Sequence, residues 1–175
     1  TLREHLEQEG PSISLAKKVT RQILDALEDI HEKHVVHRDI KPSNIKLVGG
    51  RGAVLFDFSI AAGKGLGEPP SASTSGYSPP EGGSEVTRDI FSVGVLLHEI
   101  ATGRKPLWER GGDEPMDETD GLAMPPELTY HPVLKYCLVK ALAYESGDRF
   151  QTAREFRDAL RLPGSLLNIG RWFFR

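Results

Sequence analysis

Hydrophobic residues recur at helical spacing through residues 1–30. Thr1 is followed three positions later by Glu4, which is the arrangement of a helix capping box, and Gly10 ends this first segment. A longer helix is predicted from Ser14, because apolar residues repeat every three or four positions along one face: Leu15, Val19, Ile23, Leu27 and Ile30. The pattern therefore predicts two helices, and the second has a core-facing stripe.

The hydrophobic period changes after residue 34. Residues 35–36, 45–48 and 53–56 are short apolar runs typical of strands, and a G-G-R-G turn joins the last two. Residues 63–76 are rich in Gly, Pro, Ser and Thr. A segment of this length without regular structure indicates a functional or mobile loop.

The most apolar helical pattern covers residues 89–102, where apolar side chains surround nearly the whole helix. Such a helix belongs in the centre of a domain, and Gly103 is a typical stop for it. Two further helices are predicted, one around residues 134–142 and one that begins with a capping box of Thr152 and Glu155. The predicted fold class is mainly α with a few short β-strands.

The composition is that of one compact domain: 175 residues and 19.3 kDa, with 38% hydrophobic residues. The net charge of −3 gives no basic surface that would indicate a nucleic-acid partner. No apolar run approaches the roughly 18 residues that span a bilayer. The single cysteine, Cys137, can form no internal disulfide, so we expect a reducing, cytoplasmic environment. Residues 109–121 are acidic, with six carboxylates and one arginine.

Candidate chemistry is concentrated in H-R-D-I-K-P-S-N, residues 37–44, between two predicted strands. This segment brings a carboxylate, an amine and an amide within a few residues of each other, and a second carboxylate, Asp57, follows the next strand in D-F-S. Phosphoryl transfer from a nucleotide needs a carboxylate for the hydroxyl proton, a cation beside the phosphate and oxygen ligands for Mg²⁺. The oxygens of Asn44 and Asp57 suit Mg²⁺.

With the motifs that follow them, these residues resemble the C-terminal lobe of eukaryotic-type (Hanks-type) Ser/Thr protein kinases, of the style common in bacteria. The resemblance extends over residues 1–161 and leaves 162–175 as an apolar, basic tail. It implies a catalytic loop at 35–44, an activation segment at 57–81 and a central helix at 89–102. The implied activity is ATP-dependent phosphorylation of Ser/Thr hydroxyls in a protein substrate.

The resemblance also implies a role for each residue of the site. Asp39 matches the catalytic carboxylate and Lys41 the phosphate-contacting lysine. Asn44 and Asp57 match the metal ligands, so the implied cofactors are ATP and Mg²⁺. Lys46 lies where the family has the floor of the adenine pocket, and it completes the implied nucleotide-binding set with Lys41, Asn44 and Asp57.

Five residues match positions that are structural in the family. His37 is given no chemistry, and Arg38 is expected to gather a phosphate on the activation segment. Asp89 is expected to be buried, in a role close to that of an N-cap, and to brace the catalytic loop. Glu81, in Y-S-P-P-E, is expected to pair with Arg149, in D-R-F.

The activation segment carries hydroxyl residues with distinct expected roles. Thr74 matches the substrate-loop threonine that forms hydrogen bonds near Asp39 and Lys41. Ser71 and Ser73 are the candidate sites of activating phosphorylation, because Arg38 offers a bidentate phosphate partner. Ser/Thr specificity is implied by Lys41 and Thr74.

Some departures from the family keep other functions open. The Gly-rich loop, the strand lysine and its partner glutamate are not in this sequence. An N-terminal lobe is therefore expected before Thr1, and the chain alone is expected to be inactive. Ser59 replaces the usual Gly of D-F-G, which keeps open a pseudokinase or interaction module. A small-molecule kinase of the aminoglycoside or choline type is the other alternative, and Lys41 argues against it. Membrane attachment of the parent protein is left open.

Overall fold

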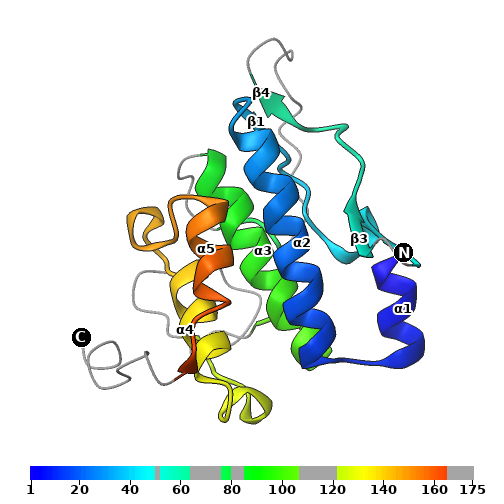
Figure 1. Cartoon of the computed structure of the whole chain (residues 1–175), viewed down its shortest axis with the longest axis vertical. Helices are drawn as coiled ribbons and strands as arrows, with labels where there is room; N and C mark the ends of the chain where they lie inside the picture. Colours follow the sequence, from blue (N-terminus) through cyan, green and yellow to red (C-terminus); the bar gives the residue numbers. More distant parts are fainter. Residues whose placement is uncertain (50–51, 64–75, 80–84, 107–121, 165–175) are drawn as a thin grey trace.

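The computed structural model describes residues 1–49, 52–63, 76–79, 85–106 and 122–164. Two long helices, α2 (Ile13–His31) and α3 (Glu85–Thr102), run side by side through the centre of the molecule, and α5 (Ala153–Ala159) packs against α2 (Figure 1). Helix α4 (Pro132–Ala141) packs on α3, and α1 (Leu2–Glu9) lies on the opposite side of the pair. The remaining elements are short: β1 (Val35–Val36), β2 (Ile45–Val48), β3 (Gly52–Leu55), β4 (Ala62–Gly63), and the 3₁₀ turns Pro42–Asn44, Pro126–Leu128 and Ser146–Asp148. The predicted fold class is confirmed.

The N-terminal helices form as the sequence predicts, with one shift. The Thr1 hydroxyl accepts a hydrogen bond from the backbone N–H of Glu4, and the reciprocal contact completes the predicted capping box. Helix α2 begins at Ile13 instead of Ser14, because Ser12 is the residue that caps it, accepting from the N–H of Leu15 at 3.3 Å. The predicted apolar stripe of α2 faces the core.

The four strands form two separate antiparallel pairs. Strand β2 pairs with β3, with Ile45 opposite Leu55, and β1 pairs with β4, with Val36 opposite Ala62. Strand β4 was not predicted, and its second residue, Gly63, is the first residue of the segment predicted to be a loop; β3 ends at Leu55 instead of residue 56. Because β1 connects to β2 and β3 to β4, this pairing brings the two connections, residues 37–44 and 56–61, next to each other. Both carry candidate chemistry.

Helix α3 is the most buried element and begins at Glu85 instead of the predicted Asp89. Asp89 therefore lies inside the helix and does not cap it. Gly94 lets α4 approach closely, since a Cβ at this position would lie 2.9 Å from Leu142 Cδ2 and 3.0 Å from Ala141 Cβ. Among the described helices none is long and apolar enough to cross a membrane.

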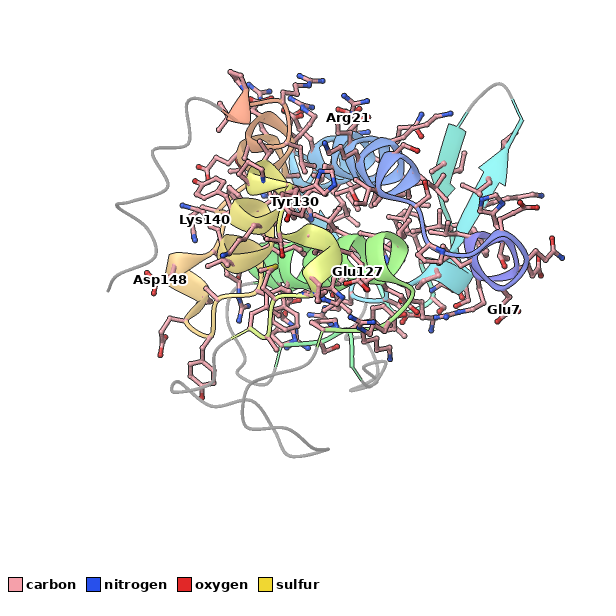
Figure 2. All side chains as sticks on the ribbon, turned by 90° about the horizontal axis from the view of Figure 1, so that it is seen from below. Glu7, Arg21, Glu127, Tyr130, Lys140 and Asp148 are labelled. Atoms are coloured by element: carbon pink, nitrogen blue, oxygen red, sulfur yellow. The ribbon has the colours of Figure 1, made fainter. Side chains whose placement is uncertain are left out.

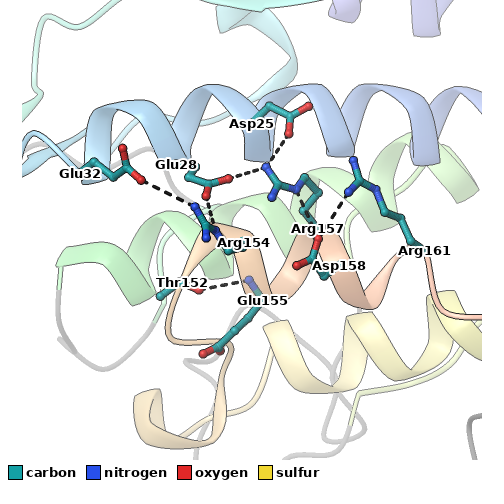
Figure 3. Close-up of polar contacts among 9 residues, drawn as sticks. All are labelled: Asp25, Glu28, Glu32, Thr152, Arg154, Glu155, Arg157, Asp158 and Arg161. Atoms are coloured by element: carbon teal, nitrogen blue, oxygen red, sulfur yellow. Dashed lines mark hydrogen bonds and ion pairs between the residues drawn. The ribbon is translucent and has the colours of Figure 1, made fainter.

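Ion pairs hold α5 along the outer face of α2 (Figure 3). Arg157 contacts Asp25 at 2.7 Å and also Glu28, and Arg154 contacts Glu28 and, at 3.9 Å, Glu32. Among other surface residues, Glu7 and Asp148 project outward and Tyr130 is 88% exposed (Figure 2). Solvent-accessible ion pairs contribute little to stability singly, so we expect the buried apolar stripes of α2 and α3 to contribute most of the stability.

Candidate catalytic site

Three of the predicted site residues come together in the loop that follows β1. The Lys41 ammonium lies 2.7 Å from Asp39 Oδ2. Asn44 Nδ2 donates to the same Oδ2 at 2.8 Å and to the backbone carbonyl of Asp39 at 2.9 Å. The 3₁₀ turn Pro42–Asn44 makes this approach possible, because it folds Asn44 back toward Asp39. The side chain of Asp39 is 10% exposed, and its carboxylate is held in place as a hydrogen-bond acceptor.

The buried carboxylate of Asp89, in α3, holds this loop in place. Asp89 is fully buried, and its Oδ2 accepts from the backbone N–H of His37 at 2.9 Å while its Oδ1 accepts from that of Arg38 at 2.8 Å. His31 Nε2 donates to the same carboxylate at 2.9 Å. Arg38 has a φ of 68°, in the left-handed region that side chains rarely adopt. Such a backbone persists only when its surroundings hold it, and Asp89 supplies that hold.

His37 connects the loop to the segment after β3. Its Nε2 donates to the carbonyl of Phe56 at 3.2 Å, so Nδ1 keeps its lone pair and accepts from the N–H of Asp39 at 3.3 Å. Burial lowers the pKa of His37, against the nearby carboxylates that would raise it. The ring also meets Phe58 edge to face, with 4.6 Å between centroids. This geometry supports a structural role for a neutral His37.

Asp57 lies between the two aromatic residues that contact His37. Its φ is 66°, and its Oδ1 accepts from the N–H of Ser59 at 3.2 Å. The preceding residue, Phe56, donates its N–H to the carbonyl of Asn44 at 3.0 Å. Backbone contacts thus tie the Asp57 segment to the catalytic loop at Asn44 and at His37.

The donor atoms of Asn44 and Asp57 fit a hard cation. Asn44 uses its amide nitrogen for Asp39, which leaves the amide oxygen without a described hydrogen bond, and the Asp57 carboxylate is exposed. Within the described ranges no cluster of three or more His, Cys, Asp or Glu side chains could hold a metal. Mg²⁺ commonly takes one or two protein oxygens and completes its shell with water and substrate phosphates, so the two oxygens are sufficient for that mode.

Lys46 lies on an exposed face beside the loop. It pairs with Val54 across the β2–β3 ribbon, so both side chains lie on the same face. Val54, Phe56 and Phe58 are 46%, 38% and 46% exposed. The exposed Lys46 and its exposed apolar neighbour Val54 are compatible with the adenine-floor position that the resemblance implies for Lys46.

Arg149 is buried in the C-terminal part of the domain and is 1% exposed. Its guanidinium donates to the carbonyls of Ala143 and Tyr144, both at 2.8 Å, and lies over the Phe91 ring. Glu81 falls outside the described residues, so the Glu81–Arg149 pair stays a prediction. Ser71, Ser73, Thr74 and the acidic stretch 109–121 fall outside them as well.

A further cluster that the sequence reasoning missed anchors Tyr77. The Tyr77 hydroxyl donates to Glu99 Oε2, and Arg3 donates to Glu99 Oε1 at 2.9 Å and to the Tyr77 oxygen at 3.0 Å. Ser92 Oγ donates to the Tyr77 carbonyl at 2.7 Å. The signal for this cluster was a glutamate, Glu99, inside an otherwise apolar helix, because a buried carboxylate needs partners. Helices α1 and α3 thereby fix the end of the segment that runs on from Thr74.

Tyr77 is expected to lose its stabilising effect at alkaline pH. Burial and the hydrogen bond to Glu99 raise its pKa above the ordinary value of 10.0. Below pH 10 the phenol is protonated in both the folded and unfolded states and its contribution is complete. Above pH 10 the unfolded chain ionises first, so the free energy of unfolding falls.

Urea unfolding at pH 8 and pH 11 measures this effect. Tyr77→Phe is expected to cost about 1–2 kcal/mol at pH 8, because buried Glu99 loses a donor, and to flatten the alkaline decline. If the free energy of unfolding of Tyr77→Phe falls between pH 8 and pH 11 as steeply as that of the unsubstituted chain, the assignment is wrong. Tyr130→Phe, at an exposed ring, is the control.

Comparison with known proteins finds one matching family model and several relatives. A family model described as the protein kinase domain matches residues 1–152. The chain is 32% identical to serine/threonine-protein kinase PknA of Nostoc sp., over 93% of this chain and 31% of the relative. It is 30% identical to serine/threonine-protein kinase Pkn1 of Myxococcus xanthus, over 82% and 23%, and 32% identical to PknB of Mycobacterium tuberculosis, over 90% and 28%. The chain thus spans less than a third of each of these relatives.

Proposed function

Since the chain belongs to the protein kinase family, we propose that it supplies the catalytic loop and the substrate-binding side of a kinase that transfers the γ-phosphoryl group of ATP to Ser/Thr hydroxyls of proteins. The observation that carries this proposal is the Asp39 carboxylate, held by both Lys41 and Asn44 and adjoined by the Asp57 segment. The match to a protein kinase domain also favours a protein acceptor over the small-molecule alternative.

Each residue has a task that its position supports. Asp39 orients the acceptor hydroxyl and accepts its proton, and Lys41 places a positive charge where the phosphoryl group passes. Asn44 and Asp57 are the residues that would hold Mg²⁺ through oxygen. When bound, Mg²⁺ neutralises charge on the phosphates. Lys46 and the exposed face around Val54 would lie under the adenine.

A second lobe, supplied outside residues 1–175, completes the proposed enzyme. The exposed apolar side chains Val54, Phe56 and Phe58 lie next to the nucleotide residues and provide a surface for such a lobe. Positioning of reactants can account for about 7–11 kcal/mol of a barrier. The described residues supply Asp39 and Lys41 for the acceptor side of that positioning, and the second lobe would cover the triphosphate. The chain alone is therefore expected to transfer phosphate very slowly.

One observation favours a pseudokinase instead. Asp57 Oδ1 accepts the N–H of Ser59, the residue that stands where the family usually has glycine. A carboxylate held in its own turn is less available to a cation. Mg²⁺-dependent nucleotide binding separates the two functions. In the pseudokinase alternative, neither Mg²⁺-dependent nucleotide binding nor phosphoryl transfer depends on Asp57.

The deciding experiment incubates labelled ATP, Mg²⁺ and a generic protein substrate with the parent protein that carries this chain, and separately with residues 1–175. We expect phosphoserine and phosphothreonine from the parent and little product from the chain alone. Absence of transfer by the parent, with ATP binding intact, would replace the kinase by the pseudokinase. Rapid transfer by the chain alone that stops on Asp39→Asn would refute the need for a second lobe.

A further inference from the structure

The side chain of Arg38 is held by a carboxylate that the sequence did not single out. Arg38 Nε donates to Glu85 Oε2 at 2.7 Å. The Arg38 side chain is 21% exposed and the Glu85 side chain 45%. Within the described part of the chain, this is the hydrogen bond that the guanidinium makes. Arg38 directly precedes the candidate catalytic carboxylate, Asp39.

Glu85 and Asp89 act on Arg38 from one face of α3. They are four residues apart, so they lie on the same side of the helix, one turn from each other. Asp89 accepts the backbone N–H of Arg38, and Glu85 accepts its side-chain N–H. Two carboxylates of one helix face therefore hold a single residue at its backbone and at its guanidinium.

This double contact explains how a strained residue is kept in place. The φ of 68° at Arg38 is unfavourable for an arginine. Asp89 alone restrains the backbone but leaves the long side chain free to rotate. The Glu85 contact removes that freedom and directs the guanidinium toward the start of α3.

We propose that Glu85 is a positioning residue of the catalytic loop, acting as the built-in counter-charge of Arg38 and competing with phosphoryl groups for it. The inference rests on the proposed function for its consequence in catalysis. A phosphoryl group carries nearly two negative charges and binds arginine bidentately, so it is the stronger partner. Glu85 is exposed enough to move aside, while the Asp89 contact stays. Without a phosphoryl group, Glu85 keeps the loop ordered.

Nuclear magnetic resonance on ¹⁵N-labelled residues 1–175 tests the contact without any need for catalysis. In the unsubstituted residues 1–175 we expect an Arg38 Nε–H signal that is protected from exchange with water. In Glu85→Gln that signal is expected to exchange with water about tenfold faster, because a neutral amide is a weaker acceptor than a carboxylate. Glu85→Asp is expected to restore part of the protection. Glu127→Gln is the matched control: it also removes one charge, from the exposed partner of Arg104.

Titration with inorganic phosphate tests the competition. In Glu85→Gln the Arg38 Nε–H signal is expected to shift at about three- to tenfold lower phosphate concentration than in the unsubstituted residues 1–175. In Glu127→Gln it is expected to shift at the same concentration as in the unsubstituted residues. The proposal would be overturned if the signal shifts at the same phosphate concentration in Glu85→Gln and in the unsubstituted residues 1–175. It would also be overturned if Glu85→Gln leaves the exchange rate of the Arg38 Nε–H unchanged. Because neither readout measures phosphoryl transfer, an inactive parent protein would refute the proposed function and leave this result standing.

The catalytic consequence is measured in the parent protein after phosphatase treatment. Glu85→Gln is expected to lower kcat by about fivefold with the KM for ATP unchanged, since the loop and not the nucleotide is displaced. Phosphorylation of the parent is expected to reduce this difference. A loss confined to KM would contradict a role in positioning the loop.

Discussion

Replacement of Asp39 by asparagine is expected to lower phosphoryl transfer by the parent protein by about 10²–10⁴-fold, with nucleotide affinity nearly unchanged. The asparagine side chain has the same shape and keeps an oxygen to accept from Lys41 and Asn44, so the loop geometry is expected to survive. It cannot take a proton from an acceptor hydroxyl at neutral pH. The rate falls because general-base and orienting contributions are lost, while no contact to the nucleotide changes.

Single-turnover rates and calorimetric ATP affinities with and without Mg²⁺ measure the two effects separately. Asp57→Asn is the informative counterpart, expected to weaken Mg²⁺-dependent ATP binding. Asp25→Asn, on the outer face of α2, is the surface control. If Asp39→Asn and Asp57→Asn lose nucleotide binding equally, the division of roles between the two carboxylates is wrong.

Removal of the Asp89 carboxylate is expected to lower the free energy of unfolding by about 3–5 kcal/mol in Asp89→Ala. The side chain is fully buried and accepts from the N–H groups of His37 and Arg38 and from the His31 ring. Alanine leaves these three donors without their acceptor in a largely buried region. Each such donor costs about 1–3 kcal/mol, and the losses are not additive because the donors share one partner.

Urea denaturation followed by circular dichroism provides the measurement. Asp89→Asn keeps one acceptor oxygen and is expected to lose about half as much as alanine. Asp29→Ala, at an exposed position of α2, is expected to change stability by less than about 0.5 kcal/mol. A loss below about 1 kcal/mol in Asp89→Ala would show that the loop is held by other contacts.

Local patterns predicted most of the fold. The capping box at Thr1, the stripe of α2 and the β2–β3 pair all depend on residues close in sequence, and they form as predicted. The start of α3 was misjudged because an aspartate before an apolar run is typical of a helix cap, whereas the carboxylate of Asp89 is used by a distant loop. Strand β4 was missed because only its pairing with β1 defines it.

In the candidate site too, only the contacts between residues close together in the sequence were predictable. Asp39, Lys41 and Asn44 lie within six residues, and the structure brings their polar groups into contact as their spacing suggested. The Arg3–Glu99–Tyr77 cluster and the Arg38–Glu85 pair join residues far apart in the chain. No periodic pattern encodes such a contact: Glu99 inside an apolar helix indicates that a partner is needed, but nothing in the sequence says which residue the partner is.

The distance along the chain between the catalytic loop and Asp89 has a consequence during synthesis on the ribosome. The hydrogen bonds from Arg38 and His37 to this carboxylate span 51 and 52 residues. At about 5–20 residues per second, the loop is made roughly 3–10 s before the group that fixes its backbone. A nascent chain that already holds residues 37–44 therefore lacks the ordered loop until α3 has emerged. The proposed catalytic geometry therefore becomes available only after residues 85–102 have been made.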